Sequence, residues 1–66
     1  MTTQVLEYLI AIEEEHSLTR AAERFYLSQP SLSYHLARAE QELKVKLFQK
    51  KGRSLLPTEE GIIFFN

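Results

Sequence analysis

Apolar residues recur every three or four positions in the first part of the chain, the spacing that places them on one side of an α-helix. They form two stripes about 100° apart, made of Val5, Leu9 and Ile12 on one side and of Leu6 and Ile10 on the other. The pattern predicts a helix from about Gln4 to Glu15, with Thr2 or Thr3 as its N-cap. Because this helix has two apolar sides, we expect two neighbours, one within the domain and one that can lie outside this chain.

Two more helices are predicted, separated by a turn of only two residues. Ser17 is placed to cap a short helix from Leu18 to Phe25, and Ser28 to cap a third helix that has Pro30 in its first turn. The core-facing side of the third helix is formed by Leu32, Leu36, Ala39 and Leu43. Its outward face is formed by Pro30, Ser33, Tyr34, Ala37, Arg38 and Gln41. Helices joined in this way fit the helix-turn-helix motif, here at about residues 18–37, whose second helix enters the DNA major groove by its N-terminal end.

The period of the apolar pattern changes after Leu43. Alternation then begins with Val45, Lys46, Leu47 and Phe48, and apolar residues resume at Leu55 and Leu56. Residues 49–54 between them predict a hairpin tip, with Gly52 supplying a positive φ. A two-stranded ribbon with a basic tip is a wing, expected at about residues 45–57, and Thr58 then caps a fourth helix. The expected fold is mainly α: a winged helix-turn-helix with a three-helix core, a two-stranded β wing and the start of a fourth helix.

The length and composition of the chain limit the classes of protein to which it can belong. The chain has 66 residues, which suits one domain, and no cysteine, so neither a disulfide framework nor a thiolate metal site is expected. No apolar run approaches the roughly 20 residues that span a bilayer, and the N-terminus lacks the basic and apolar stretches of a signal peptide. We therefore expect a cytoplasmic protein.

Charge is segregated along the chain although the formal net charge is only −1. Residues 1–15 carry four glutamates and no basic residue, whereas residues 44–53 carry five basic residues and no acidic one. Such segregation can give one side of a nearly neutral molecule a positive field that attracts nucleic acid. For a charge run taken alone, a solvated lysine-rich loop is the simpler explanation, so this alternative stays open.

The start of the third helix carries side chains suited to DNA. Serine hydroxyls reach phosphates and bases, and a glutamine such as Gln29 can bond an adenine edge through both amide atoms. Unpaired N–H groups at a helix N-terminus also favour a nearby phosphate. For Ser28 we expect helix capping to be the main role.

These residues, in this order, resemble the N-terminal domain of LysR-type transcriptional regulators. The resemblance covers essentially the whole chain, through the stretches SLTRAAER (17–24), LSQPSLS (27–33), EL (42–43), LF (47–48), GR (52–53) and LPTEEG (56–61). It implies contacts to double-stranded DNA from Gln29, Pro30, Ser31 and Ser33 of the third helix and from Arg53 of the wing. Together with the residues placed by pattern, the candidate DNA-binding set is Thr19, Ser28, Gln29, Pro30, Ser31, Ser33, Tyr34, Arg38, Lys50, Lys51 and Arg53.

Two positions depart from the family pattern. Tyr34 stands where the family often has arginine, so no arginine–guanine contact is assumed there. Lys44 stands where glycine commonly closes the third helix, which leaves the geometry of that helix end open.

The resemblance also implies a longer protein. In the family, a winged helix-turn-helix, here residues 1–58, reads a partly palindromic operator, and a linker helix that begins near residue 58 pairs two subunits. The resemblance thus implies a homodimer or a higher oligomer for the full-length regulator. A larger C-terminal domain binds a small-molecule inducer. We therefore expect residues 58–66 to be the start of that linker helix, and the 66-residue chain to be a monomer or a weak dimer that needs no cofactor.

Three other functions fit the sequence less well than DNA binding. For an enzyme, His16 and His35 lie in no metal-ligand spacing, the glutamates 13–15 splay apart on a helix, and no glycine-rich phosphate loop exists. A winged helix can instead serve protein contacts, because fold alone does not determine function. Attachment to a membrane through Ile62–Phe65 is disfavoured, since four residues are too few to anchor a chain.

Overall fold

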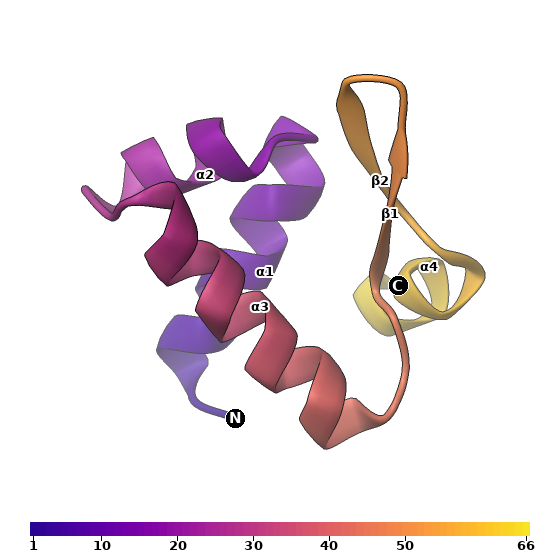
Figure 1. Cartoon of the computed structure of the whole chain (residues 1–66). Coiled ribbons are helices and arrows are strands. Elements are labelled where there is room, and N and C mark those ends of the chain that lie inside the picture. Colours follow the sequence, from indigo (N-terminus) through magenta and orange to yellow (C-terminus); the bar gives the residue numbers. More distant parts are fainter.

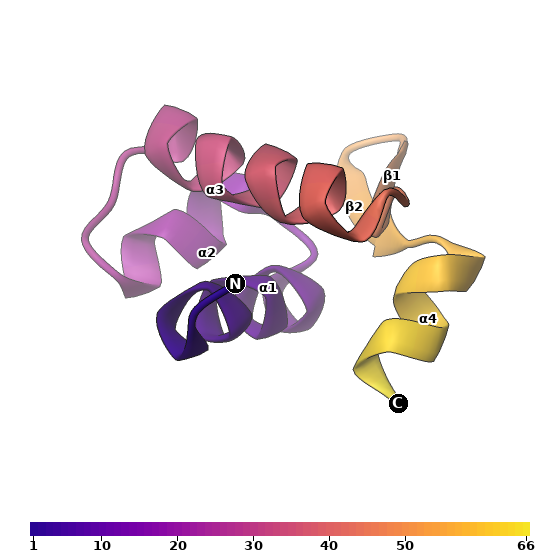
Figure 2. The ribbon, with the colours of Figure 1, turned by 90° about the horizontal axis from the view of Figure 1, so that it is seen from below.

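The computed structural model describes the whole chain, Met1–Asn66, as four helices and one antiparallel hairpin (Figure 1). In chain order the elements are α1 (Thr3–Glu15), α2 (Leu18–Arg24), α3 (Gln29–Leu43), β1 (Phe48–Lys51), β2 (Ser54–Pro57) and α4 (Glu59–Phe65). Helices α1, α2 and α3 pack together, and the hairpin and α4 lie beyond the C-terminal half of α3 (Figure 2). The predicted winged helix-turn-helix fold is confirmed.

Side-chain caps begin all four helices. In each case a hydroxyl accepts a hydrogen bond from the amide three residues on, at 3.0–3.2 Å, and the capping residues are Thr2, Ser17, Ser28 and Thr58. Three of these caps are the predicted ones, and the first helix uses Thr2 of the two threonines considered. Helix α2 ends at Arg24, one residue before the predicted end, because Phe25 leaves the helical conformation at φ −113°.

Helix ends in this chain use left-handed residues other than glycine. His16 follows α1 at φ 56° and Lys44 follows α3 at φ 61°, and each donates its amide to the carbonyl four residues back. Tyr26, in the turn between α2 and α3, also has φ 56°. Lys44 therefore ends α3 in the conformation that glycine usually supplies, and the helix stops where the sequence predicts.

The core is small and relies on close approach of the helices. Its largest fully buried side chains are Leu9, Ile12, Leu32 and Leu47. Four alanines that are at most 2% exposed separate them and let the backbones approach, namely Ala11, Ala21, Ala22 and Ala39. Tyr8 is also buried, although neither predicted stripe contains it.

The second apolar stripe of α1 stays largely uncovered. Leu6 and Ile10 are exposed, while Phe64 and Phe65 of α4 pack against the core, with the ring of Phe65 5.5 Å from that of Phe48. Ile62 and Ile63 of α4 also face solvent. The chain therefore has apolar surface left over on both α1 and α4.

The hairpin pairs Phe48 with Pro57 and Lys51 with Ser54, so its loop is only Gly52 and Arg53. Gly52 has φ +59°, the positive value that a two-residue type II′ turn requires at its first central position. The strands start at Phe48 rather than near residue 45, because Leu47 turns inward and is completely buried.

Leu47 joins the hairpin to α4. Its carbonyl accepts the amide of Thr58 at 2.9 Å, and a Cβ placed on Gly61 would lie 2.1 Å from the same oxygen. Position 61 therefore needs glycine because of a close approach between α4 and the backbone before β1.

We predict that Gly61→Ala lowers the free energy of unfolding by about 2 kcal/mol or more, because the added methyl collides with backbone rather than with a movable side chain. The measurement is urea unfolding followed by circular dichroism. Glu60→Ala, one position earlier on the exposed side of α4, is the control and should change stability by no more than about 0.5 kcal/mol. Equal effects of the two variants would contradict the close approach.

Candidate nucleic-acid interface

The first turn of α3 is exposed and carries no acidic residue. The Ser28 hydroxyl accepts the amide of Ser31 and donates to the Ser31 hydroxyl at 3.0 Å, so both serines are engaged in the cap. Gln29 and Pro30 have exposed side chains in the same turn. Because no carboxylate neutralises it, this helix end keeps the partial positive charge of its free amides.

The outward face of α3 forms as predicted. Leu32, Leu36 and Ala39 are buried. On the opposite side, Pro30, Tyr34, Ala37, Arg38 and Gln41 are exposed and Ser33 is half-buried. A helix that is exposed along one entire side can enter a groove of a partner molecule.

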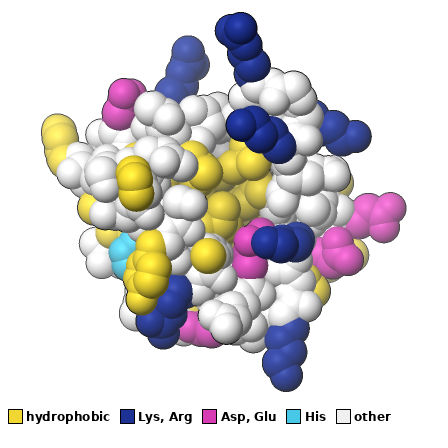
Figure 3. Space-filling model, viewed as in Figure 1, with side chains coloured by type: hydrophobic (Ala, Val, Ile, Leu, Met, Phe, Trp, Pro, Cys, Tyr) yellow, Lys and Arg dark blue, Asp and Glu magenta, His cyan; other side chains and the backbone are white.

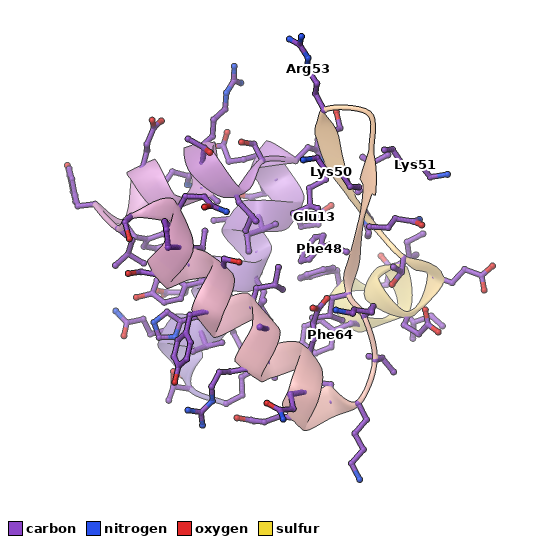
Figure 4. The ribbon with its side chains drawn as sticks, viewed as in Figure 1. Glu13, Phe48, Lys50, Lys51, Arg53 and Phe64 are labelled. Carbon is purple, nitrogen blue, oxygen red and sulfur yellow. The ribbon has the colours of Figure 1, made fainter.

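The two lysines of the wing point in opposite directions. Lys50 is directed toward the helices, Lys51 away from them, and Arg53 extends from the tip (Figure 4). The separation follows from the alternation of side chains along β1. Only Lys50 and Arg53 are therefore positioned to act together with the helices.

A groove lies between the wing and the N-terminal ends of α2 and α3. Of the candidate residues, it brings together Thr19, Gln29, Lys50 and Arg53. The rest of its lining comes from His16, Ser17, Leu18, Ser54 and Leu55. No acidic side chain lines the groove; Glu13, from α1 behind the wing, forms no ion pair with Lys50 (Figure 4).

Tyr34 and Arg38 form a separate group outside this groove. Nη1 of Arg38 donates to the Tyr34 hydroxyl at 3.0 Å, and this hydrogen bond raises the pKa of Arg38 above its ordinary value. Both residues line a second hollow, between α3 and the start of α1. The candidate set is thus divided between two sides of α3.

Four of the nine acidic side chains form ion pairs, and all of these pairs lie outside the groove. Glu14 accepts from Arg24 at 2.8 Å, which raises the pKa of Arg24, and Glu42 pairs with the N-terminal amine at 3.2 Å. Glu40 pairs with Lys46 at 3.7 Å. Arg20, Lys50 and Arg53 have no carboxylate within ion-pair distance, and basic side chains accordingly gather around the wing and the upper end of the face in Figure 3.

Glu40 is a supporting residue that the sequence pattern does not reveal. Its carboxylate accepts the amides of Leu47 at 2.6 Å and of Phe48 at 3.4 Å, so it fixes the start of the wing against α3. A second hydrogen bond joins the wing to the end of α1: the amide of Leu55 donates to the carbonyl of His16 at 2.9 Å. These hydrogen bonds hold the wing in one position relative to the helices, and this position sets the width of the groove.

The arrangement has the features of a known family. The family described as bacterial regulatory helix-turn-helix proteins, lysR family, matches residues 3–62. The chain belongs to this LysR family. Among its relatives is the transcriptional regulator YxjO of Bacillus subtilis, 41% identical over 64 residues that make up 97% of this chain and 22% of that protein.

Solved structures give the same result for the fold. The DNA-binding domain of BenM, a regulator of Acinetobacter baylyi, in complex with benA site 1 DNA, matches with a TM-score of 0.92 and 35% identity, over 98% of this chain and 73% of that one. Full-length CbnR with its target DNA matches with a TM-score of 0.88 and 31% identity, over 97% of this chain and 22% of that one. The LysR-family chain therefore spans about a fifth of the length of these full-length proteins.

Two features are absent from the LysR-family chain. None of its helices is both long and apolar enough to cross a bilayer. No three His, Cys, Asp or Glu side chains gather closely enough to hold a metal ion.

We predict that Glu40→Ala lowers the free energy of unfolding by about 2 kcal/mol, because it leaves partly buried amides without their charged acceptor. Glu40→Gln keeps one side-chain oxygen and should lose about half as much. Amide hydrogen exchange at Leu47 and Phe48 together with urea unfolding gives the measurement. The control is the exposed Glu7→Gln, and an effect of Glu40→Ala no larger than the control would refute this role for Glu40.

Proposed function

We propose that this domain binds double-stranded DNA, with α3 in the major groove and the wing beside it on the phosphate backbone or in the minor groove. The observation that carries the proposal is the groove that joins the N-terminal end of α3 to Lys50 and Arg53 without an acidic side chain. Support comes from the close fit to the BenM domain, whose structure contains DNA. Lysine and arginine near phosphates release counterions, so binding should depend strongly on salt.

Within this proposal the candidate residues have different tasks. Gln29 and Ser33 meet base edges, with Pro30 making apolar contacts beside them. Thr19 and Ser31 bond the backbone, and Ser28 acts mainly through the cap that it forms. Lys50 and Arg53 attract phosphates, whereas Lys51 contributes through its charge at longer range.

We further propose that the domain belongs to a longer regulator of transcription. The relatives are transcriptional regulators of about five times this length. In this proposal residues 1–58 are the DNA-binding domain, residues 58–66 begin a linker helix, and a further domain binds a small-molecule inducer. The protein acts in the cytoplasm and by binding rather than by catalysis.

The apolar surface left on α1 and α4 supports pairing of two subunits. Ile63 is 75% exposed and Ile10 is 47% exposed. We propose that a continued α4 buries such residues against a second copy, which places two copies of α3 on one operator. When two linked domains bind the same DNA, their combined affinity exceeds the affinity of either domain alone.

We predict that Arg53→Ala and Lys50→Ala each weaken binding to all DNA sequences alike. Each should lower the slope of log K against log salt by about one, the value for one lost phosphate contact. Lys51→Ala removes the same charge from the far side of the wing and should lower the slope by less than half as much. Titrations at several salt concentrations measure this; salt-independent binding by the unmodified domain would favour a protein-contact role instead.

We predict that Gln29→Ala relaxes base preference at one or two positions and costs about 1–3 kcal/mol on the preferred site only. Selection of bound sites from random duplexes identifies that site, and titration compares it with a scrambled duplex. Gln41→Ala, on the same helix about 18 Å farther along, is the control. An equal loss on both duplexes would show that Gln29 contacts only the backbone.

A further inference from the structure

A series of aromatic rings in contact leads from the buried core to the surface of α3. The ring of Phe25, just after α2, meets that of Tyr8 of α1 edge to face at 4.8 Å between ring centroids, and Tyr8 meets His35 of α3 at 5.2 Å in a tilted arrangement. His35 meets Tyr34 at 5.6 Å, edge to face. Tyr8 is buried, and the contacting rings come from three separate segments. These ring contacts therefore restrict the orientation of the Tyr34 ring.

The series of rings ends at the guanidinium group of Arg38. Arg38 lies 5.9 Å from the centroid of the Tyr34 ring and donates its single hydrogen bond to the Tyr34 hydroxyl at 3.0 Å. Glu42, one turn farther along α3, is the acidic residue nearest to it in the helix, and its carboxylate is taken by the N-terminal amine. Arg38 therefore keeps its charge and most of its five N–H donors available.

The pair lies on the side of α3 away from the wing. Tyr34 and Arg38 line the hollow between α3 and the start of α1, whereas Lys50 and Arg53 of the wing line the other groove. Arg38 follows Gln29 by nine residues, or about two and a half turns, so the two side chains project from opposite sides of α3. The major groove is about 12 Å wide, so when Gln29 meets the bases we expect Arg38 to face the opposite edge of the groove, where the phosphates run.

We propose that Tyr34 is a positioning residue that holds Arg38 against a DNA phosphate at the groove edge opposite the wing. The inference rests on the proposed DNA binding and adds a second anchor to it. The Tyr34 hydroxyl accepts from Arg38 at 3.0 Å, and we assign it this positioning role alone. Because the Arg38 guanidinium is already held in place, this side chain loses less entropy on binding than an unrestrained arginine side chain would.

The test is a double-mutant cycle on DNA binding by the whole chain. The variants are Tyr34→Phe, which keeps the ring and removes the hydroxyl, Arg38→Ala, and both together. Each is titrated against a duplex selected by the unmodified protein and against a scrambled duplex of the same composition, at several salt concentrations. Lys44→Gly removes one positive charge from the far end of α3, where the left-handed backbone suits glycine, and is the charge control. Tyr26→Phe removes a hydroxyl from a tyrosine that is 98% exposed and is the tyrosine control.

The expected results separate positioning from direct contact. Arg38→Ala should weaken both duplexes at least about tenfold and lower the salt slope by about one. Tyr34→Phe should weaken both about three- to tenfold while leaving the salt slope unchanged, because the charge is still present. In the Arg38→Ala background Tyr34→Phe should have less than about a twofold effect, and the two controls should have little effect.

Several outcomes would overturn the proposal. Additive effects in the cycle would mean that Tyr34 acts independently of Arg38, and losses confined to the selected duplex would mean that the pair reads bases. A domain that binds DNA normally without Arg38 would refute this inference and leave the proposed function intact. Failure of the unmodified protein to bind either duplex would refute both.

Discussion

The structure depends on the position of Leu47. Its side chain is completely buried among the helices, its amide is held by Glu40, and its carbonyl is held by Thr58. The same carbonyl leaves no room for a side chain at Gly61. One residue thus determines where the three-helix core ends, where the wing begins and how α4 is attached, and the groove between wing and α3 follows from it.

Features that depend on local chemistry were predictable. The caps at Ser17, Ser28 and Thr58 need only a hydroxyl before an apolar-periodic segment, and the core face of α3 needs only helical spacing. The hairpin tip at Gly52 followed from a glycine in a polar stretch between the alternating residues 45–48 and the apolar pair Leu55 and Leu56. The identity of the family rested on the order of such segments over nearly the whole chain.

Features that depend on the arrangement of segments were not predictable. Glu40 lies in a helix, but the amides that it accepts belong to residues seven and eight positions later, beyond a left-handed turn. Lys50 and Lys51 are equivalent as a charge run and separate only once the register of β1 is set. Tyr8 lies next to the first stripe of α1, three residues after Val5 and four before Ile12, but its partners Phe25 and His35 come from distant parts of the chain.

The left-handed residues His16, Tyr26 and Lys44 affect the conformational entropy of the unfolded chain as well as the strain of the folded one. Glycine at these three junctions would relieve about 1 kcal/mol of backbone strain at each, yet it would also widen the range of conformations open to the denatured chain. Side chains there narrow that range, so the chain gives up less freedom when it folds. Where φ is positive, however, the strain exceeds this saving, so these three junctions lower the net stability of the domain and its small core must offset them.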